Sequence, residues 1–309
     1  IRRIEICIAG CIITIFMMYS IDISYQGTIL LNELLLLYVF WACQNAYVKP
    51  VEYCHLRKVS LKSIGLIIVA AIFLFIMADY VNACSMIAFQ NLLDDSLQAI
   101  VNKPVEALVV VAILPAIIEE FLFRGMIYRG IVNKSNKKIA IIISALLFAF
   151  LHMNFNQMCY AFVMGLVFAI VIYLTDNLSV SILLHMLFNA FTVIITCFEK
   201  SNAIQAILQC NIAGYTLFNP SLTDTQGKIE ISLLIIGGLI AILSAVIAGW
   251  LILLIAKTEK TTETTINNEN ILKDNDNIFK NNEKWKPDLR FFAGSGVCIL
   301  IAILYEILL

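Results

Sequence analysis

Charge is scarce in this sequence. Asp, Glu, Lys and Arg make up 14% of the 309 residues, and the formal net charge is −1. This balance excludes a broadly basic nucleic-acid-binding surface, so we expect no nucleic-acid partner. Hydrophobic residues make up 61%, and the mean hydropathy of +0.90 is far above that of a soluble domain. We therefore expect the chain to lie in a lipid bilayer.

Motifs for disulfide frameworks and common metal sites are also missing. Nine cysteines are scattered without a Cys-x-x-Cys pair, at positions 7, 11, 43, 54, 84, 159, 197, 210 and 298. We interpret them as small residues of the membrane core, with Cys84 and Cys210 as one candidate pair. The three histidines form no His-Glu-x-x-His motif, and no serine lies in a nucleophile-elbow motif.

Long apolar runs predict the fold class. Most approach the ~20 residues that a helix needs to cross a bilayer. They predict an all-α, polytopic membrane helix bundle of about eight or nine transmembrane helices. The predicted spans are 4–20, 28–48, 63–82, 105–128, 139–155, 158–175, 178–198, 229–256 and 291–309.

Composition shifts divide the chain into five segments. The segment 257–290 is rich in Asn, Lys, Thr and Asp, which predicts a solvated, poorly ordered linker. The predicted segments are 1–104 (N-terminal spans and an interfacial stretch, 83–104), 105–198 (core helices), 199–256 (a loop and a span), 257–290 (polar cytoplasmic linker) and 291–309 (C-terminal span).

Basic residues predict the orientation. Lys and Arg cluster before the first span, between the second and third, after the fourth, and in 257–290. The positive-inside rule then places the N-terminus in the cytoplasm. The Asn-, Lys- and Ile-rich composition is typical of an AT-rich bacterial genome, so we expect a multi-pass protein of a bacterial plasma membrane.

Ionisable residues interrupt one apolar run. Residues 115–125 read Pro-Ala-Ile-Ile-Glu-Glu-Phe-Leu-Phe-Arg-Gly, with Glu119, Glu120 and Arg124 inside it. Such side chains at membrane depth cost ~2.5–3.5 kcal/mol each, so they persist where they pair or do chemistry. Residues four apart share a helix face, so Glu120 reaches Arg124 and Glu119 is left to face the bundle interior.

Polar residues of two later spans lie at similar depth. His152 follows Phe148 in a Phe-x-x-x-His pattern, and His185 and Asn189 share one helix face. At ~1.5 Å per residue, all of these lie ~9–20 Å from the predicted cytoplasmic ends, as does Glu119. A single membrane His or Asn usually joins helices. The combination favours one shared functional site.

Other polar residues have simpler interpretations. His55 lies in a basic loop and is predicted to be solvated. Glu33, Glu106 and Glu230 stand near span ends and are predicted to snorkel or to lie at the interface. Asp176, in Thr-Asp-Asn, is predicted to be a turn or cap residue.

The ordered motifs resemble a known family. Glu-Glu-x-x-x-Arg, Phe-x-x-x-His and His-x-x-x-Asn occur in this order within 105–198. This pattern is similar to that of the CPBP family, which comprises type II CAAX prenyl endopeptidases, bacteriocin-processing and immunity proteins, and Abi proteins. The resemblance implies an intramembrane endopeptidase of the glutamate type.

The resemblance also implies roles for the residues. Glu119 would be the general base, acting with His152 on a water molecule, and His185 and Asn189 would stabilise the oxyanion. The supporting residues would be Glu120, Arg124 and Phe148. A buried carboxylate and amide or imidazole donors suit such chemistry physically. The expected substrate is a membrane-associated peptide or protein, such as a leader peptide, bacteriocin or signalling peptide.

Three alternatives stay open from the residues. Zinc held by Glu119, His152 and His185 is a minority interpretation, and we otherwise expect no cofactor. A non-proteolytic partner or immunity scaffold would use the same polar cluster to hold helices or dock another membrane protein. A proton-coupled transporter would also place carboxylates at mid-membrane, but no inverted repeat is seen.

Overall fold

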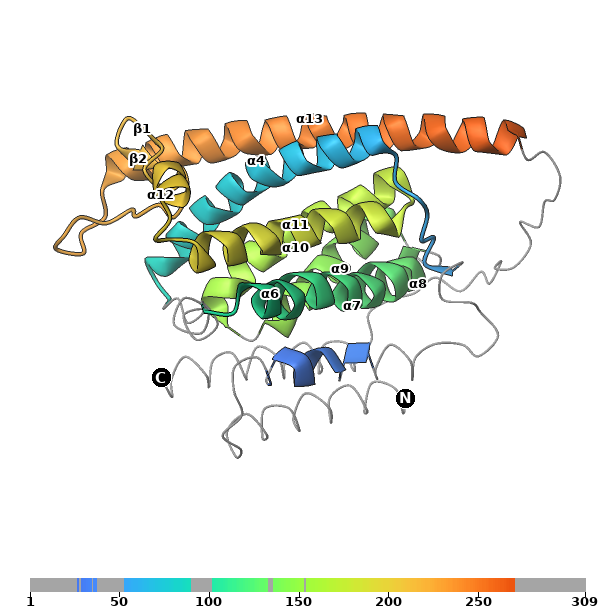
Figure 1. Cartoon of the computed structure of the whole chain (residues 1–309), viewed down its shortest axis with the longest axis horizontal. Coiled ribbons are helices and arrows are strands. Elements are labelled where there is room, and N and C mark those ends of the chain that lie inside the picture. The colour runs from blue at the N-terminus through green and yellow to red at the C-terminus, as the bar shows by residue number, and fades with distance from the viewer. Residues whose placement is uncertain are drawn as a thin grey trace.

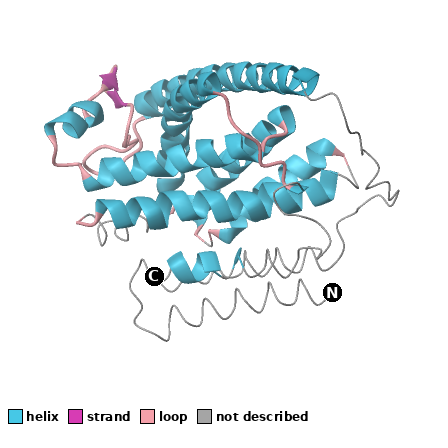
Figure 2. Cartoon of the chain, turned by 45° about the vertical axis from the view of Figure 1, so that its right-hand side comes forward, coloured by secondary structure: helices cyan, strands magenta, loops and turns pink. Residues whose placement is uncertain are grey.

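A computed structural model describes residues 27, 29–34, 36–37, 53–89, 102–132, 136–152 and 154–269, with side chains to residue 261. The predicted spans 4–20 and 291–309 lie outside the described residues, as do most of 28–48 and the linker beyond residue 269. The described part is mostly helical, with one two-stranded hairpin (Figure 2).

The bundle is built from long helices that run side by side (Figure 1). Helix α13 packs along α4, and α10 and α11 lie beneath them, followed by α9 and the run from α6 to α8. The long helices are α4 (Leu61–Met86), α9 (Lys137–Leu151), α10 (Phe155–Thr175), α11 (Leu178–Cys197) and α13 (Ile231–Glu269).

Polar caps set where the helices begin. The side chain of Ser60 accepts a hydrogen bond from a backbone N–H in the first turn of α4, and Asn136, Asn154 and Asn177 do the same for α9, α10 and α11. Such caps satisfy amide groups that have no partner within the helix. The cap residues explain why the spans start within a few residues of the predicted positions.

The predicted span 105–128 is one continuous helical run with two irregular sections. It comprises α6 (Pro104–Ala107), η1 (Leu108–Ile113), α7 (Leu114–Glu120), η2 (Phe121–Tyr128) and α8 (Arg129–Val132). Sections η1 and η2 are π-helices, whose wider turns often occur at functional sites. They lie on either side of α7, which carries Glu119 and Glu120.

Proline explains the first irregular section. Pro115 has no N–H to donate to the carbonyl of Val111, four residues earlier. The amide of Asn189, on α11, donates to this carbonyl instead, at 3.2 Å. In the second π-helix, the carbonyl of Phe123 accepts from Ser144 of α9 at 3.0 Å. Neighbouring helices thus satisfy carbonyl groups of the irregular run, as membrane helices require.

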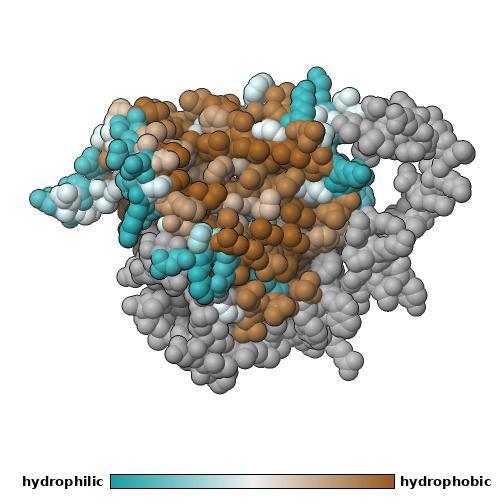
Figure 3. Space-filling model, in the orientation of Figure 1, coloured by the Kyte–Doolittle hydropathy of each residue, from teal (hydrophilic) through white to brown (hydrophobic). Residues whose placement is uncertain are grey.

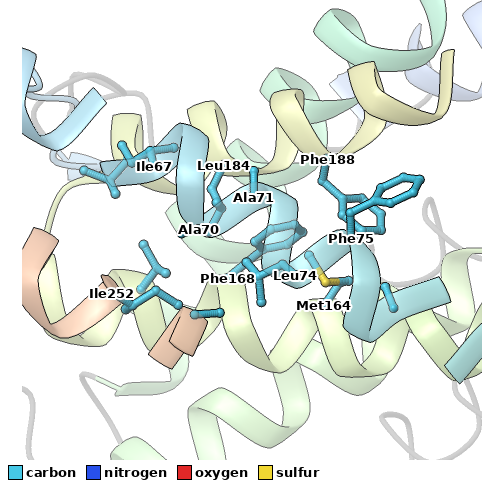
Figure 4. Packing of buried hydrophobic residues seen from close by; sticks show 14 of the residues in the cluster. Ile67, Ala70, Ala71, Leu74, Phe75, Met164, Phe168, Leu184, Phe188 and Ile252 are labelled. Carbon is cyan, nitrogen blue, oxygen red and sulfur yellow. The ribbon is translucent and has the colours of Figure 1, made fainter. Parts of the chain in front are cut away.

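The main core joins α4, α10, α11 and α13 (Figure 4). Aromatic and aliphatic side chains from these helices meet there, among them Leu74, Phe168, Phe188 and Ile252. Helices α9 and α10 approach closely at Gly165, where a Cβ would lie 3.0 Å from the Cα of Ala145. Small residues allow such close approach between membrane helices.

Four described helices are long and apolar enough to cross a membrane: α4, α10, α11 and the first 31 residues of α13. Apolar side chains cover the middle of the face seen in Figure 3, and hydrophilic ones gather toward its ends. Helix α13 exposes large apolar residues such as Leu239, Leu243 and Trp250. The structure supports a membrane protein, whereas the count of eight or nine spans stays a prediction.

Three boundaries differ from the predictions. Helix α13 continues to Glu269, so the predicted linker is wrong for 257–269, where Lys and Thr extend the helix. The loop 199–228 contains α12 (Asn202–Leu208) and a hairpin of β1 (Asn211–Ile212) and β2 (Tyr215–Thr216), so the described chain is not purely α. Residues 83–86 of the predicted interfacial stretch belong to α4.

Asp176 holds one end of the bundle together. It caps α10 in the left-handed conformation, which confirms the predicted turn. Its carboxylate binds Nδ1 of His55 at 2.7 Å, a nitrogen of Arg57 at 3.3 Å and a nitrogen of Arg129 at 2.9 Å. The prediction that His55 is merely solvated is therefore wrong. A tertiary contact with a carboxylate 121 residues away holds it.

We expect acid to weaken this cluster. Partial burial alone would raise the pKa of Asp176, but the hydrogen bond from His55 and the charge of Arg129 hold this pKa below its ordinary value of 3.8. A lowered carboxyl pKa stabilises the fold above that ordinary value, and the stability is lost as pH falls through the lowered pKa. Asp176→Asn should therefore have a lower thermal unfolding midpoint than wild type at neutral pH. The difference between the two midpoints should narrow below about pH 4 and disappear as the pH falls through the lowered pKa. A difference that does not change with pH would contradict this.

Candidate active site

Glu120 is at the centre of a buried polar network. Its carboxylate accepts hydrogen bonds from Arg124 at 2.8 Å, Ser181 at 2.6 Å and Nδ1 of His185 at 3.2 Å. Glu120 and Arg124 are completely buried. Arg124 also donates to the carbonyl of Gly165 at 3.0 Å. The network joins α7 and η2 to α10 and α11, so the expected pair Glu120–Arg124 is present and extends beyond its own helix.

Aromatic rings enclose this network. The guanidinium of Arg124 lies over the ring of Phe148, 4.4 Å from its centre. Phe148 meets both histidine rings edge-on, with centroid distances of 5.2 Å to His152 and 5.6 Å to His185. Phe168 stacks on His185 at 4.7 Å. These rings exclude water and hold the imidazoles in place, so Phe148 takes the supporting position that its motif implies.

Glu119 differs from its neighbour. It is 7% exposed, and no hydrogen bond to it is found among the described residues. Nε2 of His185 lies 3.8 Å from its Oε2. A carboxylate that is buried but not bound has oxygen atoms available for a ligand or a water molecule. The two adjacent glutamates therefore have different surroundings: three side chains donate hydrogen bonds to Glu120, and none of the described residues donates one to Glu119.

His185 bridges the two glutamates. Its Nδ1 donates to Glu120, which leaves Nε2 on the side of Glu119. Residues Ser181, His185 and Asn189 lie four apart on one face of α11. Ser181 was missed as a site residue, although its spacing of four before His185 was a usable signal.

His152 ends α9 and points back at its own helix. Its Nδ1 lies 3.0 Å from the carbonyl of Phe148. A carbonyl only accepts, so Nδ1 carries the proton and Nε2 is left to accept one. No hydrogen bond or ion pair joins His152 to Glu119 in the described part of the chain. The aromatic ring of Phe148 connects His152 to the rest of the site.

Asn189 has a structural partner in addition to any catalytic one. One N–H of its amide donates to Val111, as described above. An amide nitrogen has two hydrogens, so a second donor remains. Asn189 can therefore donate to an oxyanion through this second N–H.

The described side chains contain no evident cluster of metal ligands. Within the ranges that the structure describes, no group of three or more His, Cys, Asp or Glu residues is close enough to hold a metal ion. Zinc at Glu119, His152 and His185 stays a hypothesis that a chelator would test. The described cysteines are also free, so the candidate pair Cys84–Cys210 is not formed.

Glu33 was interpreted wrongly. A snorkelling side chain would be exposed, yet Glu33 is only 5% exposed, and its Oε2 is buried without a hydrogen-bond partner. The same segment packs into the main buried cluster through Leu36. No local pattern indicated this burial, because it depends on helices that lie far away in the chain.

Comparison with known proteins covers the same region. Residues 101–191 match the family model described as Rce1-like, type II CAAX prenyl endopeptidase. The membrane-embedded CAAX protease MroQ of Staphylococcus aureus (strain USA300) is 34% identical over 116 residues, which are 36% of this chain and 47% of that protein. The membrane peptidase YdiL of Bacillus subtilis (strain 168) is 31% identical over 87 residues, 28% of this chain and 36% of that protein.

These alignments leave part of each protein unmatched. The chain spans less than half the length of the curated relatives it matches. No solved structure matches the chain. The matched region nevertheless contains Glu119, His152, His185 and Asn189, which confirms the resemblance seen in the motifs. Residues 101–191 are therefore similar to the Rce1-like type II CAAX prenyl endopeptidases, and the rest of the chain is not matched by that family model.

Proposed function

We propose that this protein is an intramembrane endopeptidase that hydrolyses a peptide bond of a membrane-associated peptide or protein. The observation that carries the proposal is the contrast between the two glutamates. Glu120 accepts hydrogen bonds from Arg124, Ser181 and His185, whereas Glu119 is buried beside an imidazole and accepts none from the residues that the structure describes. A purely structural pair would bury both carboxylates with partners.

The reaction uses a water molecule as the nucleophile. Glu119 accepts a proton from this water, and Nε2 of His152, which has no proton of its own, helps to orient it. The oxygen bonds to the carbonyl carbon of the substrate, and the carbonyl electrons move onto its oxygen. Collapse of this intermediate breaks the C–N bond, and Glu119 returns the proton to the leaving amine.

Donors for the oxyanion come from α11. The second N–H of Asn189 is one, and Nε2 of His185 is the other when His185 is doubly protonated. Glu120 at Nδ1 favours the positive charge that this requires, whereas the burial of the imidazole opposes it. Loss of one such donor typically lowers kcat by ~10²–10³-fold.

The substrate is the part least constrained by the chain. The relatives are named as a CAAX protease and a membrane peptidase. The site lies among apolar helices, so a substrate has to enter from the bilayer or from its interface. We propose leader peptides, bacteriocins or signalling peptides of a bacterial plasma membrane as the substrate class.

The test is cleavage of a library of internally quenched peptides by the purified full chain in detergent. We expect cleavage by wild type, a loss of ~10²-fold or more in His152→Ala, and no effect of a chelator. Inhibition by the chelator would instead assign the chemistry to zinc.

The alternative is a non-proteolytic scaffold, for which the hydrogen bonds that join α11 to α7 and η1 provide support. No cleavage by wild type of any peptide, combined with a cellular phenotype that survives Glu119→Gln, would overturn the proposed function in favour of that scaffold.

A further inference from the structure

An open groove lies between the last turn of α10 and the part of α13 around residues 253–261. Its volume is about 400 Å³, and its lining consists of Leu174, Leu253, Ala256, Lys257, Lys260 and Thr261. Two leucines and an alanine form an apolar part, and two lysines with a threonine form a polar part. None of these residues takes part in the hydrogen bonds around Glu120, so the groove is separate from the candidate active site.

The groove lies where α13 reaches the bilayer surface. The apolar span of this helix covers Ile231–Thr261, so the groove is at the end of the span. Trp250, Leu253, Lys257 and Lys260 are exposed and are spaced three or four residues apart, which puts them on one face of the helix. Tryptophan and leucine followed by two lysines is the order expected where a helix leaves the hydrocarbon core and enters the headgroup region.

The carboxylate on this turn of α13 is directed into the bundle. Glu259 is 7% exposed. Its Oε1 accepts a hydrogen bond from the backbone N–H of Ser60 at 3.2 Å, and its Oε2 accepts one from the amide of Asn177 at 3.1 Å. Lys257 and Lys260 are exposed on the outer side. Helix α13 therefore turns its negative charge toward the starts of α4 and α11 and its positive charges toward the groove (Figure 1).

Other cations gather at the same end of the bundle. Nζ of Lys137, the first residue of α9, lies 5.0 Å from the ring centre of Tyr173, the residue before Leu174. The segments that start α4 and α9, together with α8, supply further basic residues, namely Arg57, Lys58, Lys62, Arg129 and Lys138. The described carboxylates at this end, Asp176 and Glu259, already accept hydrogen bonds from the protein. This end therefore carries an excess of positive charge.

We propose that the groove binds an anionic phospholipid. The headgroup phosphate accepts hydrogen bonds from the ammonium groups of Lys257 and Lys260, and an acyl chain lies against Leu174, Leu253 and Ala256. Basic pockets between membrane helices suit such headgroups. A free phosphate ion would use the lysines alone, whereas a phospholipid also covers the apolar part of the lining. The site does not depend on the proposed function.

The test is thermal unfolding of the purified full chain in a neutral detergent with added lipid. Phosphatidylglycerol should raise the unfolding midpoint of wild type as its concentration increases, because a ligand of the folded state stabilises it. Phosphatidylcholine with the same acyl chains has no net charge and should have a much smaller effect. Lys257→Gln/Lys260→Gln should need ~10-fold more phosphatidylglycerol for the same rise, whereas Lys257→Arg/Lys260→Arg should respond like wild type.

The matched control removes two lysines from the opposite end of the bundle. Lys200→Gln/Lys228→Gln changes the net charge by the same amount and should respond to phosphatidylglycerol like wild type. All four lysines are exposed, so each variant should keep the wild-type unfolding midpoint without lipid.

Four results would overturn the proposal. An undiminished response of Lys257→Gln/Lys260→Gln would exclude the groove, and an equal loss in the control would assign the effect to net charge. Equal effects of the two lipids would exclude recognition of an anionic headgroup. A rise of the same size with inorganic phosphate would replace the lipid by a free anion.

Discussion

Glu119→Gln should lower kcat/KM for peptide cleavage by ~10²–10⁴-fold without lowering the stability of the fold. The amide has the shape of the carboxyl group but cannot accept the proton of water. No hydrogen bond to Glu119 is found among the described residues, so its replacement breaks none of the described bonds. It also removes a charge from an apolar bundle, and we expect the thermal unfolding midpoint to be equal to that of wild type or higher.

The adjacent residue provides a matched control. Glu120→Gln is the same chemical change one position further on, but it weakens the contacts with Arg124, Ser181 and His185. We expect it to lower both the activity and the unfolding midpoint. The measurements are kcat/KM with one cleaved peptide and thermal unfolding of each variant in the same detergent. Full activity of Glu119→Gln would exclude Glu119 as the base.

Arg124→Met should lower the free energy of unfolding by ~3–5 kcal/mol. Arg124 is fully buried, and its loss leaves the charge of Glu120 without a cation. It also removes the bond to the carbonyl of Gly165 and the contact with the ring of Phe148. The double variant Arg124→Met/Glu120→Gln should recover part of this loss, because it leaves no unpaired buried charge.

The control for this prediction lies at the end of the bundle. Arg129→Met breaks an ion pair with Asp176, whose side chain is 50% exposed. Water screens such a pair, so its loss should cost much less. Equilibrium unfolding in mixed micelles would compare the variants. If Arg124→Met and Arg129→Met had the same unfolding midpoint, the buried network would not stabilise the fold in the way proposed here.

Both predictions depend on which carboxylate receives the hydrogen bonds. The structure has Ser181, Arg124 and His185 on Glu120, whereas no described residue donates a hydrogen bond to the adjacent Glu119. A general base must keep an open lone pair while its surroundings stay rigid. Under the proposed function, Glu120 positions the histidine and Glu119 accepts the proton.

The sequence by itself determined the features that depend on composition and on short spacings. Its apolar runs indicated a helical membrane protein, and three motifs indicated the family. The spacing of four residues predicted the ion pair between Glu120 and Arg124, which the structure contains. Asp176 was likewise recognisable as a turn residue from its immediate neighbours.

Only the tertiary structure decided the contacts between distant segments. It buried Glu33 within the bundle, and it placed Asn189 on the carbonyl that Pro115 leaves without a donor and His55 on Asp176. The reason is that helices with apolar residues on all faces carry no amphipathic pattern that would fix their rotation. Which side of such a helix faces its neighbour depends on packing and on a few buried hydrogen bonds, and these form only when the whole bundle is assembled.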